Sequence, residues 1–255
     1  MNGVNSSNEE KESTQIIRFK LTSYKGVAMG IIALFDEWPE RYEQWFATPI
    51  GKLVKKVEQE TVNDLLDPKQ GEKILDVGCG TGIFTIDFLI KGANIVGLDN
   101  SRPMLNFALK KGKDYFFSAV LGDMECLPFK DDSFDKTVSI TALEFIPDAK
   151  NAINELFRVT RPGGCVVVAT LNILSPWATR RKMKAKNDHK HVLRNAIFRS
   201  PNELLALCPY VGVVKTVIHF QKDDDPGSAV KLEYLGQLKK LDTGAFIAAR
   251  WQKPC

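Results

Sequence analysis

Short apolar runs along the chain alternate with longer segments of mixed polarity. The apolar runs have strand length and end at glycine, proline or acidic residues. Six runs predict strands: residues 74–77, 94–99, 134–140, 165–170, 211–217 and 245–251, and a further strand is expected near Val120. Residues 50–66, before the first strand, and residues 83–90, between the first two strands, have helical patterns, and Asp67-Pro68 ends the first of these helices. Alternation of strands and helices favours an α/β fold with a mostly parallel sheet.

The segment before the first strand is rich in aromatic residues. Phe35, Trp38, Tyr42, Trp45 and Phe46 recur every three or four positions, which predicts one face of a helix. That face either packs on the core or covers a ligand site.

A glycine-rich loop follows the first strand directly. Residues 74–82 read Ile-Leu-Asp-Val-Gly-Cys-Gly-Thr-Gly, and a helical run comes next. Strand, glycine loop and helix together bring a nucleotide-like ligand against bare backbone. The spacing G-x-G-x-G differs from the dinucleotide fingerprint, and no Gly-Lys-Ser/Thr follows that would cradle a triphosphate. Asp76, two positions before Gly78, suits a ligand that carries a cation.

Further acidic residues follow later strands. Asp99 closes the second strand, where a carboxylate can accept both hydroxyls of a ribose. Ser101 has the features of a helix cap. Residues 122–135 read GDMECLPFKDDSFD, and residues 156–164 read LFRVTRPGG.

These four segments, in this order across residues 72–170, resemble class I S-adenosylmethionine-dependent methyltransferases, nearest to the ubiquinone/menaquinone-biosynthesis group. The resemblance implies a Rossmann-like seven-stranded mixed sheet whose last strand is antiparallel, helices on both faces and an N-terminal helical cap. It implies S-adenosyl-L-methionine as cofactor. The alternative is a Rossmann-like domain that binds another adenosine compound, or none.

The resemblance also implies roles for individual residues. Asp99 would hold the ribose, Met104 would lie at the adenine edge, Asp123 would accept from the adenine amino group, and the Met124 amide would contact a ring nitrogen. Tyr42 and Trp45 would contact the methionine end. The full set of expected cofactor-binding residues is Tyr42, Trp45, Asp76, Gly78, Cys79, Gly80, Thr81, Asp99, Asn100, Met104, Asp123, Met124 and Thr141.

The sequence singles out no catalytic residue. Displacement at a methyl sulfonium needs alignment and exclusion of water, and it needs a base only if the nucleophile must lose a proton. Residues 143–146 read Leu-Glu-Phe-Ile, with phenylalanine where the related quinone enzymes have histidine. Asp36, Tyr42, His189 and His191 are the remaining candidates for a base.

Residues 171–199 form a long connection after the fifth strand, and such segments are often lids or binding elements. Seven basic residues are concentrated there: Arg180, Arg181, Lys182, Lys184, Lys186, Lys190 and Arg194. They predict either a solvated helix face or a gate for an anionic substrate or a nucleic acid. The nearby histidines lack cysteine or carboxylate partners, so no metal site is predicted.

Composition places few further limits. We expect a tail at 1–13 without fixed structure, then one methyltransferase domain over 14–255, with an N-terminal cap at 14–70 and a lid-like insertion at 171–199. Five cysteines and the polar N-terminus favour a reduced, cytoplasmic protein, and no apolar run is long enough to insert in a membrane.

Negative signals narrow the methyl acceptor. The Asn/Asp-Pro-Pro-aromatic signature of amino-methylating nucleic-acid enzymes is absent after the fourth strand, and so is a Pro-Cys nucleophile in the core. A small-molecule acceptor is therefore favoured, and nucleic acid is disfavoured. The alternatives are an RNA methyltransferase and a non-catalytic protein that binds the cofactor. The sequence does not indicate the oligomeric state.

Overall fold

The computed structural model describes residues 35–188 and 191–255. Its centre is a seven-stranded sheet in the order β3-β2-β1-β4-β5-β7-β6. The strands are β1 Lys73–Val77, β2 Asn94–Asp99, β3 Phe117–Leu121, β4 Phe134–Ile140, β5 Thr160–Leu171, β6 Gly212–Val217 and β7 Phe246–Gln252. Neighbours from β3 to β5 are parallel, while β7 is antiparallel to both β5 and β6. The predicted mixed sheet with an antiparallel last strand is confirmed.

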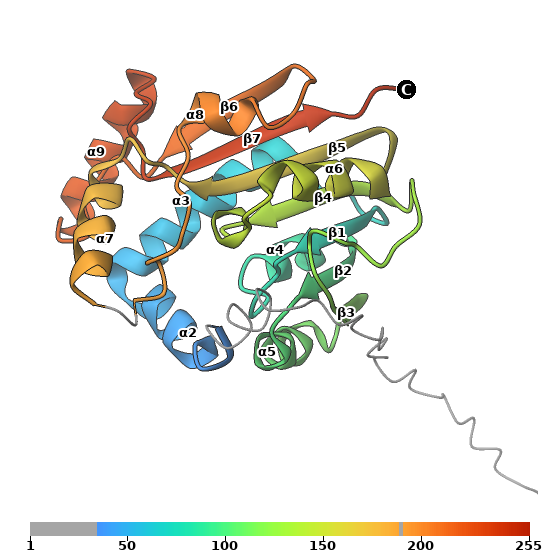
Figure 1. Cartoon of the computed structure of the whole chain (residues 1–255). Coiled ribbons are helices and arrows are strands. Elements are labelled where there is room, and N and C mark those ends of the chain that lie inside the picture. The colour runs from blue at the N-terminus through green and yellow to red at the C-terminus, as the bar shows by residue number, and fades with distance from the viewer. Residues whose placement is uncertain (1–34, 189–190) are drawn as a thin grey trace, which may run out of the picture.

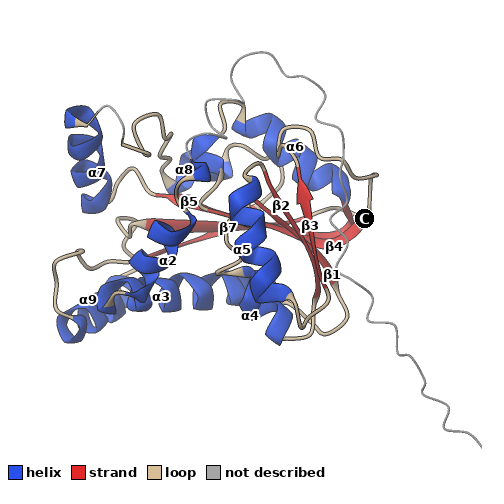
Figure 2. Cartoon of the chain, turned by 90° about the horizontal axis from the view of Figure 1, so that it is seen from below, coloured by secondary structure: helices blue, strands red, loops and turns tan. Residues whose placement is uncertain are grey.

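Helices cover both faces of this sheet. The helices are α2 Pro39–Ala47, α3 Pro49–Leu66, α4 Thr85–Ile90, α5 Arg102–Gly112, α6 Ala149–Val159, α7 Pro176–Asn187, α8 Pro201–Leu205 and α9 Pro226–Leu238, with a 3-10 turn, η1, at Leu143–Phe145. Figure 2 shows α6 and α8 on one face and α3, α4 and α9 on the other. In Figure 1, α2 and α7 lie beyond the end of the sheet, on the side of α3. None of the described helices is long and apolar enough to cross a membrane.

The two faces of the sheet have separate apolar cores. One core packs side chains of α3, α4 and α5, such as Val62 and Phe88, against Ile74 and Phe246. The other packs α6 and α8 against the opposite face through residues such as Leu156. Alternate residues of one strand serve both cores: Ile74 faces the first, whereas Leu75 and Val77 face the second. A sheet buried on both sides explains why its strands read as nearly continuous apolar runs.

Helix ends follow the signals in the sequence. Asp67 has a left-handed backbone (φ 47°) and ends α3 just before Pro68. The Ser101 hydroxyl accepts from the Met104 amide and caps α5. Ser200 and Glu203 form a reciprocal capping box at the start of α8. The ends at Asp67 and Ser101 are as predicted.

Two elements differ from expectation. The single helix predicted across the aromatic residues is interrupted at Trp38, and α2 starts at Pro39 because proline lacks the amide hydrogen that an unbroken helix would need. β5 starts five residues before the predicted strand, at Thr160, which pairs with Phe134 before a register shift. The predictions for residues 1–34 and for His189 lie outside the described residues.

Candidate functional site

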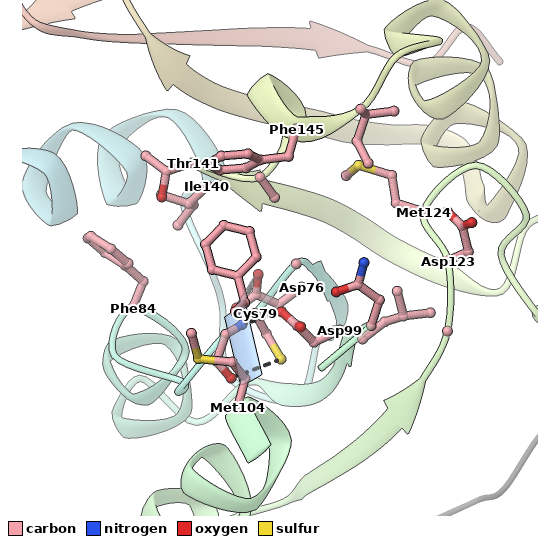
Figure 3. Close-up of a pocket in the computed structure, with 18 of the residues that line it drawn as sticks. Asp76, Cys79, Phe84, Asp99, Met104, Asp123, Met124, Ile140, Thr141 and Phe145 are labelled. Atoms are coloured by element: carbon pink, nitrogen blue, oxygen red, sulfur yellow. Dashed lines mark hydrogen bonds between the residues drawn. The ribbon is translucent and has the colours of Figure 1, made fainter. Parts of the chain in front are cut away.

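A cavity opens at the carboxyl ends of β1, β2 and β4. It encloses about 880 Å³, part of it open to solvent. Figure 3 shows Asp76, Cys79 and Asp99 on one side of it and Thr141 and Phe145 on the opposite side. This is the position where parallel α/β sheets bind their ligands, because the loops that follow neighbouring strands diverge there. The cavity therefore has a glycine-loop side and a side formed by the residues after β4.

The glycine loop depends on a backbone that only glycine adopts easily. Gly78, Gly80 and Gly82 have φ values of 75°, 53° and 74°. A side chain at Gly78 would overlap Ala142, which follows β4. A side chain at Gly80 would meet no protein atom within 4 Å and would occupy the cavity instead. The first glycine thus lets two loops approach, and the second leaves room for a ligand.

Asp99 is held by main-chain amides. Its two carboxylate oxygens accept hydrogen bonds from Gly80 N (2.8 Å) and Ser101 N (2.9 Å). Burial raises the pKa of Asp99 to about 6, although these amides act in the opposite direction. Each carboxylate oxygen can accept more than one bond, so Asp99 keeps acceptor capacity toward the cavity.

Asp76 is more deeply buried and less satisfied. One oxygen accepts from the Thr85 hydroxyl at 2.6 Å, and the other is buried with no hydrogen-bond partner among the described residues. Burial, with a further contribution from Asp99, raises the pKa of Asp76 to about 7. A buried carboxylate oxygen without a donor suits a ligand that brings its own N–H group.

The opposite side of the cavity is more apolar. Phe35 packs edge-on against Phe145, with 4.8 Å between the ring centroids. Tyr42 is hydrogen-bonded to Thr141, and burial raises the pKa of its phenol well above the usual range. Thr141 itself has a left-handed backbone (φ 51°), a strained state for a β-branched residue that is common at functional sites.

Eleven of the thirteen predicted residues line the cavity. They are Tyr42, Asp76, Gly78, Cys79, Gly80, Asp99, Asn100, Met104, Asp123, Met124 and Thr141. The other two, Trp45 and Thr81, lie outside it. Trp45 packs against Trp177, with 6.4 Å between ring centroids. The Thr81 hydroxyl donates to Glu43 at 2.5 Å.

Glu43 links the N-terminal helix to the glycine loop. The same carboxylate oxygen accepts from Thr81 and, at 2.5 Å, from the Lys111 ammonium group of α5. A hydroxyl and a cation on one acceptor fix α2 against both the loop and α5. Thr81 therefore positions the cap over the cavity, a role that the sequence motif alone did not indicate.

The candidates for a base fall into three positions. Asp36 accepts from the Ser101 hydroxyl at 2.7 Å, and His191 accepts from the Leu193 amide at 3.2 Å; neither lines the cavity. Tyr42 does line it, but its raised pKa keeps the phenol protonated near neutral pH. Tyr42 is thus a hydrogen-bond donor there rather than a base.

Several lining residues were not predicted. They are Phe35, Ile83, Phe84, Leu98, Gly122, Ile140, Ala142, Phe145 and Ile146. Most are apolar, and an apolar side chain in a ligand site looks the same in sequence as one in a core. Ala142, Phe145 and Ile146 follow β4 directly, so their place after a strand end was the available signal.

The comparisons with known proteins agree with this geometry. A family model described as "Methyltransferase domain" matches residues 75–168. An uncharacterised protein of Methanocaldococcus jannaschii is 30% identical over 225 residues, which cover 86% of this chain and 98% of that protein. The chain belongs to the class I S-adenosylmethionine-dependent methyltransferases. It is an enzyme of that family, and its methyl donor is S-adenosyl-L-methionine.

Two further comparisons place this methyltransferase among its relatives. The demethylmenaquinone methyltransferase of Corynebacterium glutamicum strain R is 35% identical over 139 residues, covering 54% of this chain and 58% of that enzyme. A Thermotoga maritima crystal structure described as a methyltransferase, possibly for histamine, superposes with a TM-score of 0.67 at 24% identity, covering 87% of this chain and 99% of that one. The first match covers little more than half of either chain, and the second shows a shared fold.

Proposed function

We propose that this methyltransferase acts on a small-molecule acceptor, which binds on the Thr141 and Phe145 side of the cavity. The observation that carries the proposal is the division of the cavity into two unlike sides. Buried carboxylates and bare backbone form the side of the glycine loop, and aromatic and aliphatic side chains form the other. The cofactor is polar and charged, so it suits the first side and leaves the second for the acceptor.

The residues of the polar side fit the cofactor. Asp76 has a buried oxygen without a partner, which can accept from the ammonium group of the methionine part. Asp99 has remaining acceptor capacity for the ribose hydroxyls, and Met104 supplies an apolar wall for the adenine. A cofactor in this orientation would direct its methyl group toward Tyr42 and Thr141.

The cofactor supplies an activated methyl group, and the protein supplies alignment and a dry site. Phe35, Phe145 and Ile146 exclude water from the acceptor side. Tyr42 can donate a hydrogen bond that orients the acceptor. Since methyl transfer is an in-line displacement, holding the nucleophile on the line between methyl carbon and sulfur is the main catalytic task.

Among the basic residues of α7, Lys182, Lys184 and Lys186 are exposed, but the two arginines are engaged within the protein. Arg180 pairs with Asp223, and Arg181 points inward, with one guanidinium nitrogen buried. A track for a nucleic-acid backbone needs several accessible cations in a row. This arrangement supports a small acceptor over RNA, and so does the C. glutamicum relative, which is named for demethylmenaquinone.

The proposal is tested by incubating the protein with methyl-labelled cofactor and a fractionated metabolite extract. We expect label in a low-molecular-mass product, and much less label with the Asp99→Ala variant at a cofactor concentration below saturation. Label that is lost after ribonuclease treatment would favour an RNA acceptor. Binding of the cofactor without any labelled product, from metabolites or RNA, would favour a non-catalytic role.

A further inference from the structure

Three charged side chains from three separate elements, two of them buried and the third partly buried, interact electrostatically near the cavity. They are Glu58 of α3, Glu144 of η1 and Arg181 of α7, and the two glutamates are only 6% and 1% exposed. Tyr42, which lines the cavity, lies close enough to both glutamates for them to raise the pKa of its phenol. The group is therefore near Tyr42, on the acceptor side, although none of its three residues is among those that line the cavity.

These charges interact without pairing directly. Arg181 influences the pKa of both glutamates, yet the described residues show no ion pair between Arg181 and either of them. Glu144 accepts from the Thr170 hydroxyl at 2.9 Å with one oxygen, and its other oxygen is buried without a partner. One terminal nitrogen of Arg181 is also buried without a partner.

A fourth charge nearby is already satisfied. Arg199 lowers the pKa of Glu144, but it donates to the carbonyl oxygens of Leu143 and Ile197 at 3.3 and 3.1 Å. By contrast, Glu233 shows how a buried glutamate is normally accommodated here. Its two oxygens accept from the His219 amide and the Gln237 side chain at 2.7 and 2.8 Å. Buried charged atoms without such partners point to a ligand that would supply them.

The unsatisfied atoms define the complementary ligand. The unpartnered Glu144 oxygen calls for an N–H donor, and the unpartnered Arg181 nitrogen calls for an oxygen lone pair, while Glu58 adds a second buried carboxyl group. Two carboxylates face one guanidinium, so a cation balances their charge. The guanidinium carbon lies 5.0 Å from the Trp177 ring centroid, and Trp177 packs on Trp45, so an apolar wall borders the same site.

We propose that Glu58, Glu144 and Arg181 form the polar end of the acceptor site and bind an acceptor that carries a protonated amine next to an oxygen atom. This assignment rests on the proposed function, since it takes the acceptor to be a small molecule on this side of the cavity. Burial raises the pKa of Glu58 to about 8 and that of Glu144 to about 7. A bound cation would favour the ionised forms of both glutamates, so binding of the cation and loss of their protons would favour each other.

The test compares three probes with the same aromatic body and different charge: 2-amino-1-phenylethanol, 1-phenylethane-1,2-diol and mandelate. Binding is measured by calorimetry on protein saturated with S-adenosylhomocysteine. We expect the amine to bind at least about tenfold more tightly than the diol, as one charge-assisted bond provides, and mandelate to bind most weakly. Equal binding of all three, or tightest binding of mandelate, would overturn the proposal.

Variants separate ligand binding from a structural role. Glu58→Gln and Glu144→Gln should each weaken amine binding about tenfold and leave diol binding within about twofold. Both variants should keep or raise the melting temperature, because each removes a carboxyl group whose ionisation is disfavoured by burial. The matched control, Glu233→Gln, should lower the melting temperature and leave probe binding unchanged.

Two results would contradict the assignment in different ways. Glutamine variants that melt earlier, as the Glu233 control does, and still bind the amine normally would show that the three charges only hold α3, η1 and α7 together. Wild-type protein that binds no S-adenosylhomocysteine would count against the proposed function itself. Normal binding of that product without any preference for the amine would overturn the subsite alone.

Discussion

Asp99 and Glu144 are both buried carboxylates beside one cavity, but their surroundings differ. The oxygens of Asp99 accept from two backbone amides, and one of these belongs to a residue two positions away in the chain. Glu144 has a single side-chain donor, Thr170, and its charged neighbours come from α3 and α7. The cofactor side is therefore built by the main chain around a glycine loop, whereas the acceptor side is assembled from side chains of distant segments.

This difference separates cofactor binding, which many chains can share, from recognition of one particular acceptor. Backbone donors do not depend on residue identity, so a glycine loop can hold the same cofactor in many chains. Side chains such as Glu58 and Arg181 can be replaced one at a time without disturbing the sheet. The acceptor side is thus the part of the molecule that can determine specificity.

The largest expected effect is the loss of cofactor binding when the glycine loop is altered. Gly78→Ala should abolish detectable cofactor binding and destabilise the fold by roughly 2 to 4 kcal/mol, because the new side chain overlaps Ala142 at a φ of 75°. Gly71→Ala is the matched control, with a φ of 80° and open space around the new methyl group. It should cost about 1 kcal/mol and leave affinity unchanged in titration calorimetry. Equal loss of cofactor affinity in both variants would contradict the role given to Gly78.

The next effect concerns the acceptor side and depends on pH. Burial raises the pKa of Glu58 to about 8 in the folded protein, so the folded state binds the proton more tightly than the unfolded state. Stability from this group is present below the ordinary pKa near 4.5 and is lost as pH rises through about 8. Glu58→Gln should therefore gain stability over the wild type from pH 5 to pH 8, by on the order of 2 to 4 kcal/mol at the end of that range.

A control of opposite sign is available at the start of α8. Hydrogen bonds from Ser200 lower the pKa of Glu203, so Glu203→Gln should be less stable than the wild type above about pH 5. Denaturant titrations at several pH values measure both differences. A Glu58→Gln difference that does not change with pH would show that Glu58 is not buried as described.

A smaller effect tests the cofactor side at Asp99. Asp99→Ala should weaken cofactor binding by about tenfold or more, because a charge-assisted bond to a ribose hydroxyl contributes roughly 1.5 to 3 kcal/mol. Asp148→Ala is the control, since Asp148 caps α6 by accepting from the Asn151 amide and lies outside the cavity. It should lower the melting temperature with no change in affinity. Unchanged affinity of the Asp99 variant would remove this residue from the site.

The smallest effect lies at the boundary between the two sides. Tyr42→Phe removes the hydroxyl that is hydrogen-bonded to Thr141, a loss of about 1 kcal/mol. Methyl transfer to the active extract fraction should slow by about fivefold. Cofactor affinity should stay within about twofold by calorimetry. An affinity loss as large as that of the Asp99 variant would move Tyr42 to the cofactor side.

The same division explains what could be predicted from the sequence. Strand ends, the glycine loop and Asp99 are neighbours in the chain, so their spacing carries the information that places them. Residues 134–140 were predicted as a strand with the bounds that β4 has. Ser101 was recognised as a cap because a cap interacts within one turn of its own helix.

The acceptor side could not be predicted in this way. Glu58 and Arg181 are 123 positions apart, and nothing near either residue shows that they will be neighbours. Arg181 stands among basic residues that suggested a solvated helix face, yet one of its terminal nitrogens is buried. Trp45 was expected near the cofactor because of the family resemblance, and in the structure it packs on Trp177 and does not line the cavity.

The attachment of α2 has a consequence for how the two ligands influence each other. Glu43 fastens this helix to the glycine loop and α5, and Trp45 fastens it to α7. A shift of α2 on cofactor binding would therefore reach Arg181 through Trp177. Thermodynamic reciprocity applies to these two ligands. If bound cofactor changes the affinity for the acceptor by some factor, bound acceptor must change the affinity for the cofactor by the same factor. The attachments of α2 therefore make this helix the element through which the binding of one ligand can change the affinity for the other.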